Sequence, residues 1–221
     1  MNEFATAPQH WDQQWADPAK RAAWEQAEDR VLAVAHRHRD HGAKYALDLG
    51  CGVGRHALAL AEMGYGVEAL DGAPTGLERV REAARARDLN LNTHQGEFTD
   101  LPYPDGQFDY VLSWNVIYHG DEEIVKTAIA EIHRVLRPGG IYQGTMLSKR
   151  NANYGVGQEV APDTWVNGGV LDKAHPHYYC DAKTLLDLFG AFEALTVEDY
   201  EQRPGAFHWH IVAEKPFAPS I

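Results

Sequence analysis

The segment Asp48-Leu49-Gly50-Cys51-Gly52-Val53-Gly54 gives the strongest indication of how this chain folds. A short apolar run, Tyr45 to Leu49, leads into it, and a helical pattern follows from about Arg55 to Met63. Glycines at every second position let the backbone turn tightly and approach a ligand without a Cβ in the way. The first turn of the following helix points free N–H groups at the same place. The sequence therefore predicts a strand, a glycine loop and a helix that together hold a ligand.

Strand and helix patterns alternate outward from this loop. Strands are expected at 45–49, 66–70, 91–95, 108–115, 141–146, 192–201 and 207–215, and helices at 18–41, 55–63, 74–87, 125–136 and after Asp181. Such alternation predicts an α/β fold with a mostly parallel sheet covered by helices on both faces. Only Arg203-Pro204-Gly205 separates the last two strands, so they must pair antiparallel.

No repeat or linker divides the 221 residues, and we expect one domain. Within it we expect an N-terminal helix and lid (1–42), a ligand-binding core (43–147), a lid insertion over the substrate (148–180), and a C-terminal helix with a β-hairpin (181–221). The insertion has little periodicity and many glycine, asparagine and aromatic residues.

Composition argues against several classes of partner. The formal charge of -12, from 32 acidic and 20 basic side chains, repels phosphate backbones, so neither nucleic acid nor an anionic membrane is expected. No run of about 18 apolar residues is present, and the first residues do not resemble a signal peptide. The two cysteines do not form a disulfide framework, so we expect a cytoplasmic protein, either monomer or homodimer.

Acidic residues near strand ends predict the chemistry of the ligand. Asp48 precedes the first glycine by two residues, where a carboxylate suits a cationic amine better than a pyrophosphate. Asp71 ends the second strand and suits ribose hydroxyls, while Glu97 and Phe98 follow the third and suit an adenine ring. A nicotinamide-dependent oxidoreductase would share the Asp71 feature, but it needs a G-x-G-x-x-G loop. Each residue also has an ordinary interpretation, such as a helix N-terminal charge or a loop acid.

The ordered set of motifs resembles class I S-adenosylmethionine-dependent methyltransferases. It comprises the glycine loop, Asp71, Gly96-Glu97, Phe108-Asp109-Tyr110-Val111 and Leu136-Arg137-Pro138-Gly139-Gly140. The resemblance implies a Rossmann-like sheet of seven strands in the order 3-2-1-4-5-7-6. It also implies that Asp48 and Gly50 hold the methionine part of the cofactor, Asp71 the ribose, and Glu97 (more often Asp in the family) with Phe98 the adenine. The complete predicted cofactor set is Trp15, Asp48, Gly50, Cys51, Gly52, Gly54, Asp71, Gly72, Glu97, Phe98 and Asn115.

The methyl acceptor is predicted from weaker signals. The fourth strand ends in Ser113-Trp114-Asn115-Val116, which lacks the Asn/Asp-Pro-Pro-Tyr/Phe motif of enzymes that methylate amide or nucleobase nitrogens. Tyr118 and His119 follow it and are the catalytic candidates. No fixed motif supplies a strong base, which favours a small, soft or already ionised nucleophile such as a thiol, sulfide or other chalcogen. The alternatives are O- or N-methylation of a small metabolite and a non-catalytic S-adenosylmethionine-binding module.

Aromatic and histidine residues outside the core are expected to form the rest of the pocket. Trp11 and Trp15 share a helical face and close over the ligands, and His175, His177 and Tyr178 contact the acceptor. No metal site is predicted, because the pairs His175/His177 and His208/His210 lack a recognised third ligand. The tryptophan-rich start and the His-Pro-His-Tyr segment are loosely similar to bacterial thiol- and tellurite-methylating enzymes.

Overall fold

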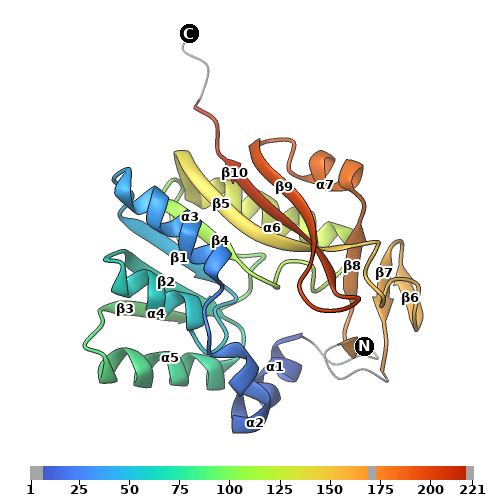
Figure 1. The fold of residues 1–221 in the computed structure, drawn as a ribbon, viewed down its shortest axis with the longest axis horizontal. Coiled ribbons are helices and arrows are strands. Elements are labelled where there is room, and N and C mark those ends of the chain that lie inside the picture. Colours follow the sequence, from blue (N-terminus) through green and yellow to red (C-terminus); the bar gives the residue numbers. More distant parts are fainter. Residues whose placement is uncertain (1–6, 169–172, 218–221) are drawn as a thin grey trace.

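A twisted sheet carries the site, with its parallel strands in the order β3-β2-β1-β4-β5 (Figure 1). The computed structural model describes residues 7–168 and 173–217. These strands are β1 (Tyr45–Leu49), β2 (Gly66–Asp71), β3 (Leu91–Gln95), β4 (Phe108–Ser113) and β5 (Leu136–Ser148). β10 (Phe207–Glu214) lies antiparallel beside β5, and β9 (Glu193–Glu201) antiparallel beside β10. The predicted seven-strand order with its antiparallel C-terminal pair is confirmed.

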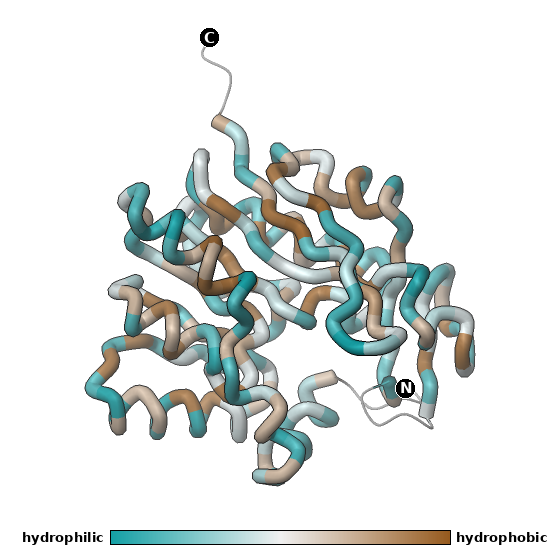
Figure 2. The backbone as a smooth tube through the Cα atoms, viewed as in Figure 1, coloured by the Kyte–Doolittle hydropathy of each residue, from teal (hydrophilic) through white to brown (hydrophobic). Residues whose placement is uncertain are grey.

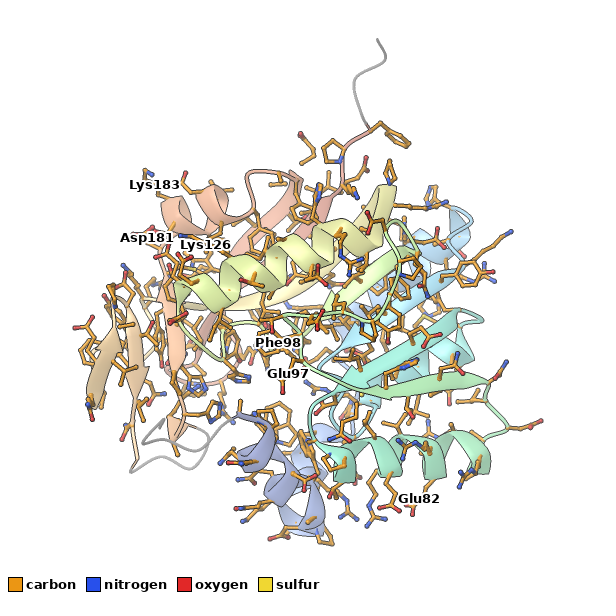
Figure 3. The ribbon with its side chains drawn as sticks, turned by 180° about the vertical axis from the view of Figure 1, so that it is seen from behind. Glu82, Glu97, Phe98, Lys126, Asp181 and Lys183 are labelled. Atoms are coloured by element: carbon orange, nitrogen blue, oxygen red, sulfur yellow. The ribbon has the colours of Figure 1, made fainter. Side chains whose placement is uncertain are left out.

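Helices cover both faces of this sheet, as the apolar strands require. α3 (Asp29–Asp40), α4 (Arg55–Glu62) and α5 (Pro74–Ala86) cover one face, and α6 (Glu122–Val135) and α7 (Ala182–Leu188) cover the other (Figures 1 and 3). All six residues of β4 are buried between the two layers. Figure 2 shows apolar segments in the central strands and polar segments in the loops and outer turns. Side chains on α6 are buried at helical spacing: Val125, Ala128, Ile129, Ile132 and Val135.

The N-terminal region differs from the single helix predicted at 18–41. It forms α1 (Ala7–Ala16), α2 (Pro18–Arg21) and a 3-10 turn, η1 (Ala22–Trp24), before α3 begins. The side chain of Asp17 accepts a hydrogen bond from the Ala19 N–H, and Pro18 occupies the first helical position, so a new short helix begins there. The chain then changes direction, and Trp24 contacts Trp11 and Trp15 instead of belonging to the buried face of α3.

The insertion after β5 is more regular than predicted. β6 (Gln158–Ala161), β7 (Thr164–Val166) and β8 (His177–Cys180) form a small antiparallel sheet, and β8 also pairs in parallel with the end of β5. Strands of three or four residues are too short to give a clear periodicity, which is why the sequence did not reveal them. Residues 169–172 of the predicted insertion and 1–6 of the predicted lid lie outside the described residues.

Membrane-spanning helices are not found among residues 7–168 and 173–217, where each helix is too short or too polar to cross a bilayer.

Candidate active site

The glycine loop is held in a conformation that side chains rarely adopt. Gly50, Gly52 and Gly54 have φ angles of 71°, 54° and 86°, all left-handed. A Cβ on Gly50 would overlap the side chain of Val116, and one on Gly52 would lie 2.9 Å from the ring of Trp15. The loop is therefore packed so closely from both sides that only glycine fits.

Asp71 anchors this loop from the end of β2. Its Oδ2 accepts a hydrogen bond from the Gly52 N–H at 2.7 Å, and its Oδ1 accepts one from the Ala73 N–H at 2.8 Å. An ionised carboxylate has about four acceptor positions, so two remain for a diol. Burial raises the pKa of Asp71 to about 6, with smaller contributions from the nearby Asp12 and Glu97 carboxylates. The residue therefore combines a structural bond to the loop with free acceptor capacity.

A cavity, here called the cofactor pocket, joins the loop to the other strand ends. Glu97 and Phe98 bring the loop after β3 to its rim, where Figure 3 shows them at the sheet edge that faces α1. Of the predicted cofactor residues, those lining the pocket are Trp15, Gly50, Cys51, Gly52, Asp71, Gly72, Glu97, Phe98 and Asn115. Asp48 and Gly54 do not line it. Gly54 instead precedes the first turn of α4 and lies against Val80.

Three tryptophans cover the cofactor pocket. Trp11 and Trp15 stack with ring centroids 5.0 Å apart, and Trp24 meets both edge-on at 5.3 and 6.0 Å. The Thr75 N–H donates to Oδ1 of Asp12 at 2.8 Å, which attaches α1 to the start of α5. The N-terminal helices therefore form a cover over the loop.

Asp48 lies buried beneath the pocket, with 2% of its surface exposed. Within the described residues its Oδ2 has no hydrogen-bond partner. Burial raises its pKa to about 7, although the Ala57 N–H and the Arg55 guanidinium act in the opposite direction. A buried carboxylate with an unpartnered oxygen suits a cationic ligand group nearby, because such a ligand would stabilise its charged form.

Arg55 lines both the cofactor pocket and the neighbouring cavity but was not among the predicted site residues. It is the first residue of α4. Its guanidinium lies 3.3 Å from a Glu28 carboxylate oxygen and 5.3 Å from the centre of the Trp24 ring. A cation directly after a glycine loop suits a ligand carboxylate, and that position was a signal available in the sequence.

Binding of a cationic amine is expected to release a proton from Asp48. Because folding raises the pKa of Asp48 from 3.8 to about 7, protonation of its carboxylate stabilises the folded state. This stabilisation is complete below pH 4 and is lost as the pH rises through 7. The ligand favours the ionised form, so its affinity should rise about tenfold between pH 6 and pH 8. Calorimetry in buffers of different ionisation enthalpy measures both the affinity and the released proton.

The Asp48→Asn variant is the control for this prediction. It removes the titration of Asp48 and leaves that of Asp71, whose pKa of about 6 gives a pH dependence in the same direction. The variant should lose most of the pH dependence between pH 6 and 8. An affinity that is flat over this range in the unaltered chain would contradict the assignment.

A second, larger cavity of about 580 Å³, here called the acceptor pocket, adjoins the first. The two share Trp11, Trp24, Arg55, Asn115 and His119 in their linings. Asn115 has a left-handed φ of 63°, and its Oδ1 accepts hydrogen bonds from the Thr145 hydroxyl at 3.0 Å and the Gln202 amide at 3.3 Å. These bonds hold a strained residue at the boundary between the two cavities.

Most of the predicted acceptor residues surround this cavity. Trp11, Tyr118, His119 and His177 line it, and His175 lies behind them with its ring 4.9 Å from that of His119. Tyr178 differs from the prediction. It lies on the opposite face of β8 from His177 and is buried in the hydrophobic core, so it does not line the acceptor pocket.

Three histidines converge beside the acceptor pocket, although no metal site was predicted. One ring nitrogen from each of His119, His175 and His177 lies within 4.8 Å of the other two. The pair His208/His210 is not part of this cluster: His210 contacts Gln143 at 2.9 Å, and His208 contacts a backbone carbonyl. The third member is His119, from the loop after β4.

Burial lowers the pKa of all three converging histidines, and that of His175 falls to about 3. The rings are therefore neutral at pH 7. A buried neutral imidazole of this kind is a weak base and an available electron-pair donor.

Known proteins share both the motifs and the fold. Residues 46–140 match the family model described as "Methyltransferase domain". Methyltransferase phqN of Penicillium fellutanum is 26% identical over 190 residues, which cover 83% of this chain and 56% of that protein. The chain spans about half the length of the curated relatives it matches.

Solved structures agree in fold. A structure described as a SAM-dependent methyltransferase from Methanosarcina mazei superposes with a TM-score of 0.71 at 21% identity, covering 87% of this chain and 100% of that one. The 1,6-didemethyltoxoflavin-N1-methyltransferase of Burkholderia thailandensis, solved with bound 1,6-didemethyltoxoflavin and S-adenosylhomocysteine, has a TM-score of 0.67 at 19% identity, covering 98% of this chain and 94% of that one.

Residues 46–140 of this chain therefore match a methyltransferase domain, and the cofactor that such a domain uses is S-adenosylmethionine. The residues fit this group. The glycine loop gives close backbone approach, Asp48 offers an unpartnered buried carboxylate oxygen, and Asp71 keeps acceptor capacity for a ribose.

Proposed function

We propose that this chain transfers the methyl group of S-adenosylmethionine to a small molecule bound in the acceptor pocket. The observation that carries the proposal is the meeting of the two cavities at Asn115 and His119. The reaction is a direct in-line displacement. The acceptor forms a bond to the methyl carbon, the bond from carbon to the sulfonium breaks, and the electron pair stays on sulfur as S-adenosylhomocysteine.

The acceptor we propose is a small soft nucleophile, such as a thiol, sulfide or other chalcogen. His119 is too weak a base at neutral pH to ionise a hydroxyl, because burial lowers its pKa well below the usual value. A thiol loses its proton far more readily, and an ionised thiol needs only alignment and exclusion of water. The tryptophan cover and the buried rings around Tyr118 supply that exclusion.

Charge supports an anionic acceptor. The whole chain carries -12, yet four cationic residues line the acceptor pocket: Arg30, Arg55, Lys173 and Arg203. Glu28 and Glu201 also line the pocket, and the ion pairs Arg30–Glu198 and Arg55–Glu28 reduce the effect of two of the cations. A positive potential at this point would lower the pKa of a bound thiol and attract its thiolate.

A panel of acceptors tests the proposal, with S-adenosylhomocysteine formation as the readout. Sulfide, methanethiol, larger thiols, selenite and tellurite should give turnover at least tenfold above phenols and amines of similar size. Turnover confined to phenols or amines would replace the soft-nucleophile class by O- or N-methylation of a small metabolite. Binding of cofactor without turnover on any acceptor would favour a non-catalytic module.

The Tyr118→Ala variant tests whether the two cavities bind different ligands. Tyr118 lines the acceptor pocket but not the cofactor pocket, so the KM for the acceptor should rise at least tenfold while S-adenosylhomocysteine affinity changes less than twofold. The matched control is Tyr45→Ala, whose ring is 56% exposed at the start of β1. Loss of cofactor binding in the Tyr118 variant would contradict this division.

A further inference from the structure

The histidine cluster is built by two segments that a backbone bond holds together. The Tyr178 N–H on β8 donates to the Tyr118 carbonyl at 2.9 Å, which sets His119 beside His177. The ring centroids of His119 lie 4.9 Å from those of both His175 and His177, and the latter two are 4.4 Å apart. His175 and His177 are each only 1% exposed.

Hydrogen bonding fixes which nitrogen the His177 ring can offer. Nδ1 of His177 donates to the His175 carbonyl at 2.7 Å, so the lone pair of this ring lies on Nε2. In the part of the chain that the structure describes, Nε2 of His177 and both ring nitrogens of His175 have no hydrogen-bond partner. Unpartnered buried polar atoms are costly and call for an explanation, and a ligand that accepts their electron pairs supplies one.

We propose that His119, His175 and His177 bind one divalent transition-metal ion, with zinc the ion that their chemistry suits best. Three neutral imidazoles with one open position are the ligand set of catalytic zinc sites. Zinc–nitrogen bonds of about 2.0–2.1 Å place tetrahedral donors roughly 3.3 Å apart, so small side-chain rotations close the present separations. A metal-ligating imidazole usually donates its other N–H to a fixed acceptor, which orients the ring. The bond from His177 Nδ1 to the His175 carbonyl is such a contact.

The open position would face the acceptor pocket, because His119 and His177 both line it. A thiol or hydrogensulfide would bind there as a fourth ligand. A sulfur–metal bond would form; a neutral thiol would pass its S–H proton to water, whereas hydrogensulfide would bind as the anion. The metal-bound sulfur would then attack the methyl carbon, as in the displacement above. This role rests on the proposed function, whereas metal binding itself does not.

Neighbouring groups bear on the charge of the site. Lys173, His10 and Tyr118 surround the cluster, and the Lys173 ammonium lies 5.9 Å from the Tyr118 ring centre. Burial, with a smaller contribution from Lys173, lowers the pKa of His119 and His177, but the Lys173 ammonium also repels a divalent ion. An anionic fourth ligand offsets that repulsion, and a Lys173→Met variant should bind the metal severalfold more tightly.

Cobalt(II) titration of the untagged chain tests the proposal, because four-coordinate cobalt gives strong visible bands that zinc abolishes by displacement. One ion per chain is expected. The His175→Asn and His177→Asn variants should weaken binding at least 100-fold. His36→Asn, which alters an exposed histidine on α3, is the matched control and should bind as tightly as the unaltered chain.

Binding that is absent, or equally strong in all three variants, would overturn the metal site, because surface histidines would then explain it. Affinity for S-adenosylhomocysteine and the thermal midpoint report whether each variant is folded. If the variants unfold, a one-to-one cobalt spectrum and a zinc-dependent rise in the midpoint of the unaltered chain decide the question. A bound metal without turnover on any sulfur acceptor would refute the proposed acceptor while leaving the metal site intact.

Discussion

Replacing Asp71 with alanine is expected to weaken binding of S-adenosylmethionine and S-adenosylhomocysteine at least 100-fold. The change removes the acceptor that we assign to the ribose hydroxyls. It also removes the bonds to the Gly52 and Ala73 N–H groups, so the loop is no longer held in place. Hydrogen bonds to a charged group contribute about 1.5–3 kcal/mol each, and two such bonds to a diol account for a factor of 100 or more.

Isothermal calorimetry compares the cofactor affinity of this variant with that of Asp40→Ala, which also removes one carboxylate. Asp40 is exposed at the end of α3 and lines neither pocket, so its removal should change affinity less than twofold. Circular dichroism checks that the Asp71 variant is folded at the temperature of the titration. A folded Asp71→Ala protein with unchanged affinity would show that the ribose is held elsewhere.

The Gly50→Ala variant is the second change with a large expected effect. A left-handed φ of 71° costs a non-glycine residue about 1–2 kcal/mol, and the overlap of the new Cβ with Val116 adds about 1–3 kcal/mol of overpacking. The loop or the Val116 side chain must move to relieve the overlap, and both line the cofactor pocket. We expect lower stability to urea and no measurable cofactor binding.

Gly42→Ala separates the two causes. Gly42 has a left-handed φ of 96°, but nothing lies within 4 Å of its missing Cβ. This variant should show the backbone cost alone, with cofactor affinity unchanged. If both variants lost the same stability and both bound cofactor normally, close packing of the loop would play no part in the site.

Local signals explain why much of the fold and cofactor pocket could be predicted. A left-handed glycine loop between a buried strand and a helix is visible in the sequence, and so is an acid at the end of the next strand, such as Asp71. Parallel strands bring such residues to one edge of the sheet, so the meeting of Asp71 and Glu97 followed from topology. The antiparallel end of the sheet followed from the short Arg203-Pro204-Gly205 connection.

Tertiary contacts explain what could not be predicted. The helix breaks after α1 where the Asp17 side chain accepts a hydrogen bond from the Ala19 N–H. This break allows Trp24 to contact Trp11. Tyr178 and His177 are neighbours in sequence, yet strand alternation sends them to the core and the pocket respectively. His119 joins the other histidines only through the bond between two distant backbone segments. No spacing rule links residues that are separated by 56 positions, as His119 and His175 are.

Calorimetric titration of the unaltered chain with S-adenosylhomocysteine tests the cofactor assignment most directly. The account predicts one site per chain with a low-micromolar dissociation constant, which corresponds to roughly -8 kcal/mol. NADH, titrated in parallel, should give no binding, because the buried carboxylate of Asp48 opposes a pyrophosphate. Absence of S-adenosylhomocysteine binding by the folded chain, or binding of NADH in its place, would contradict the account.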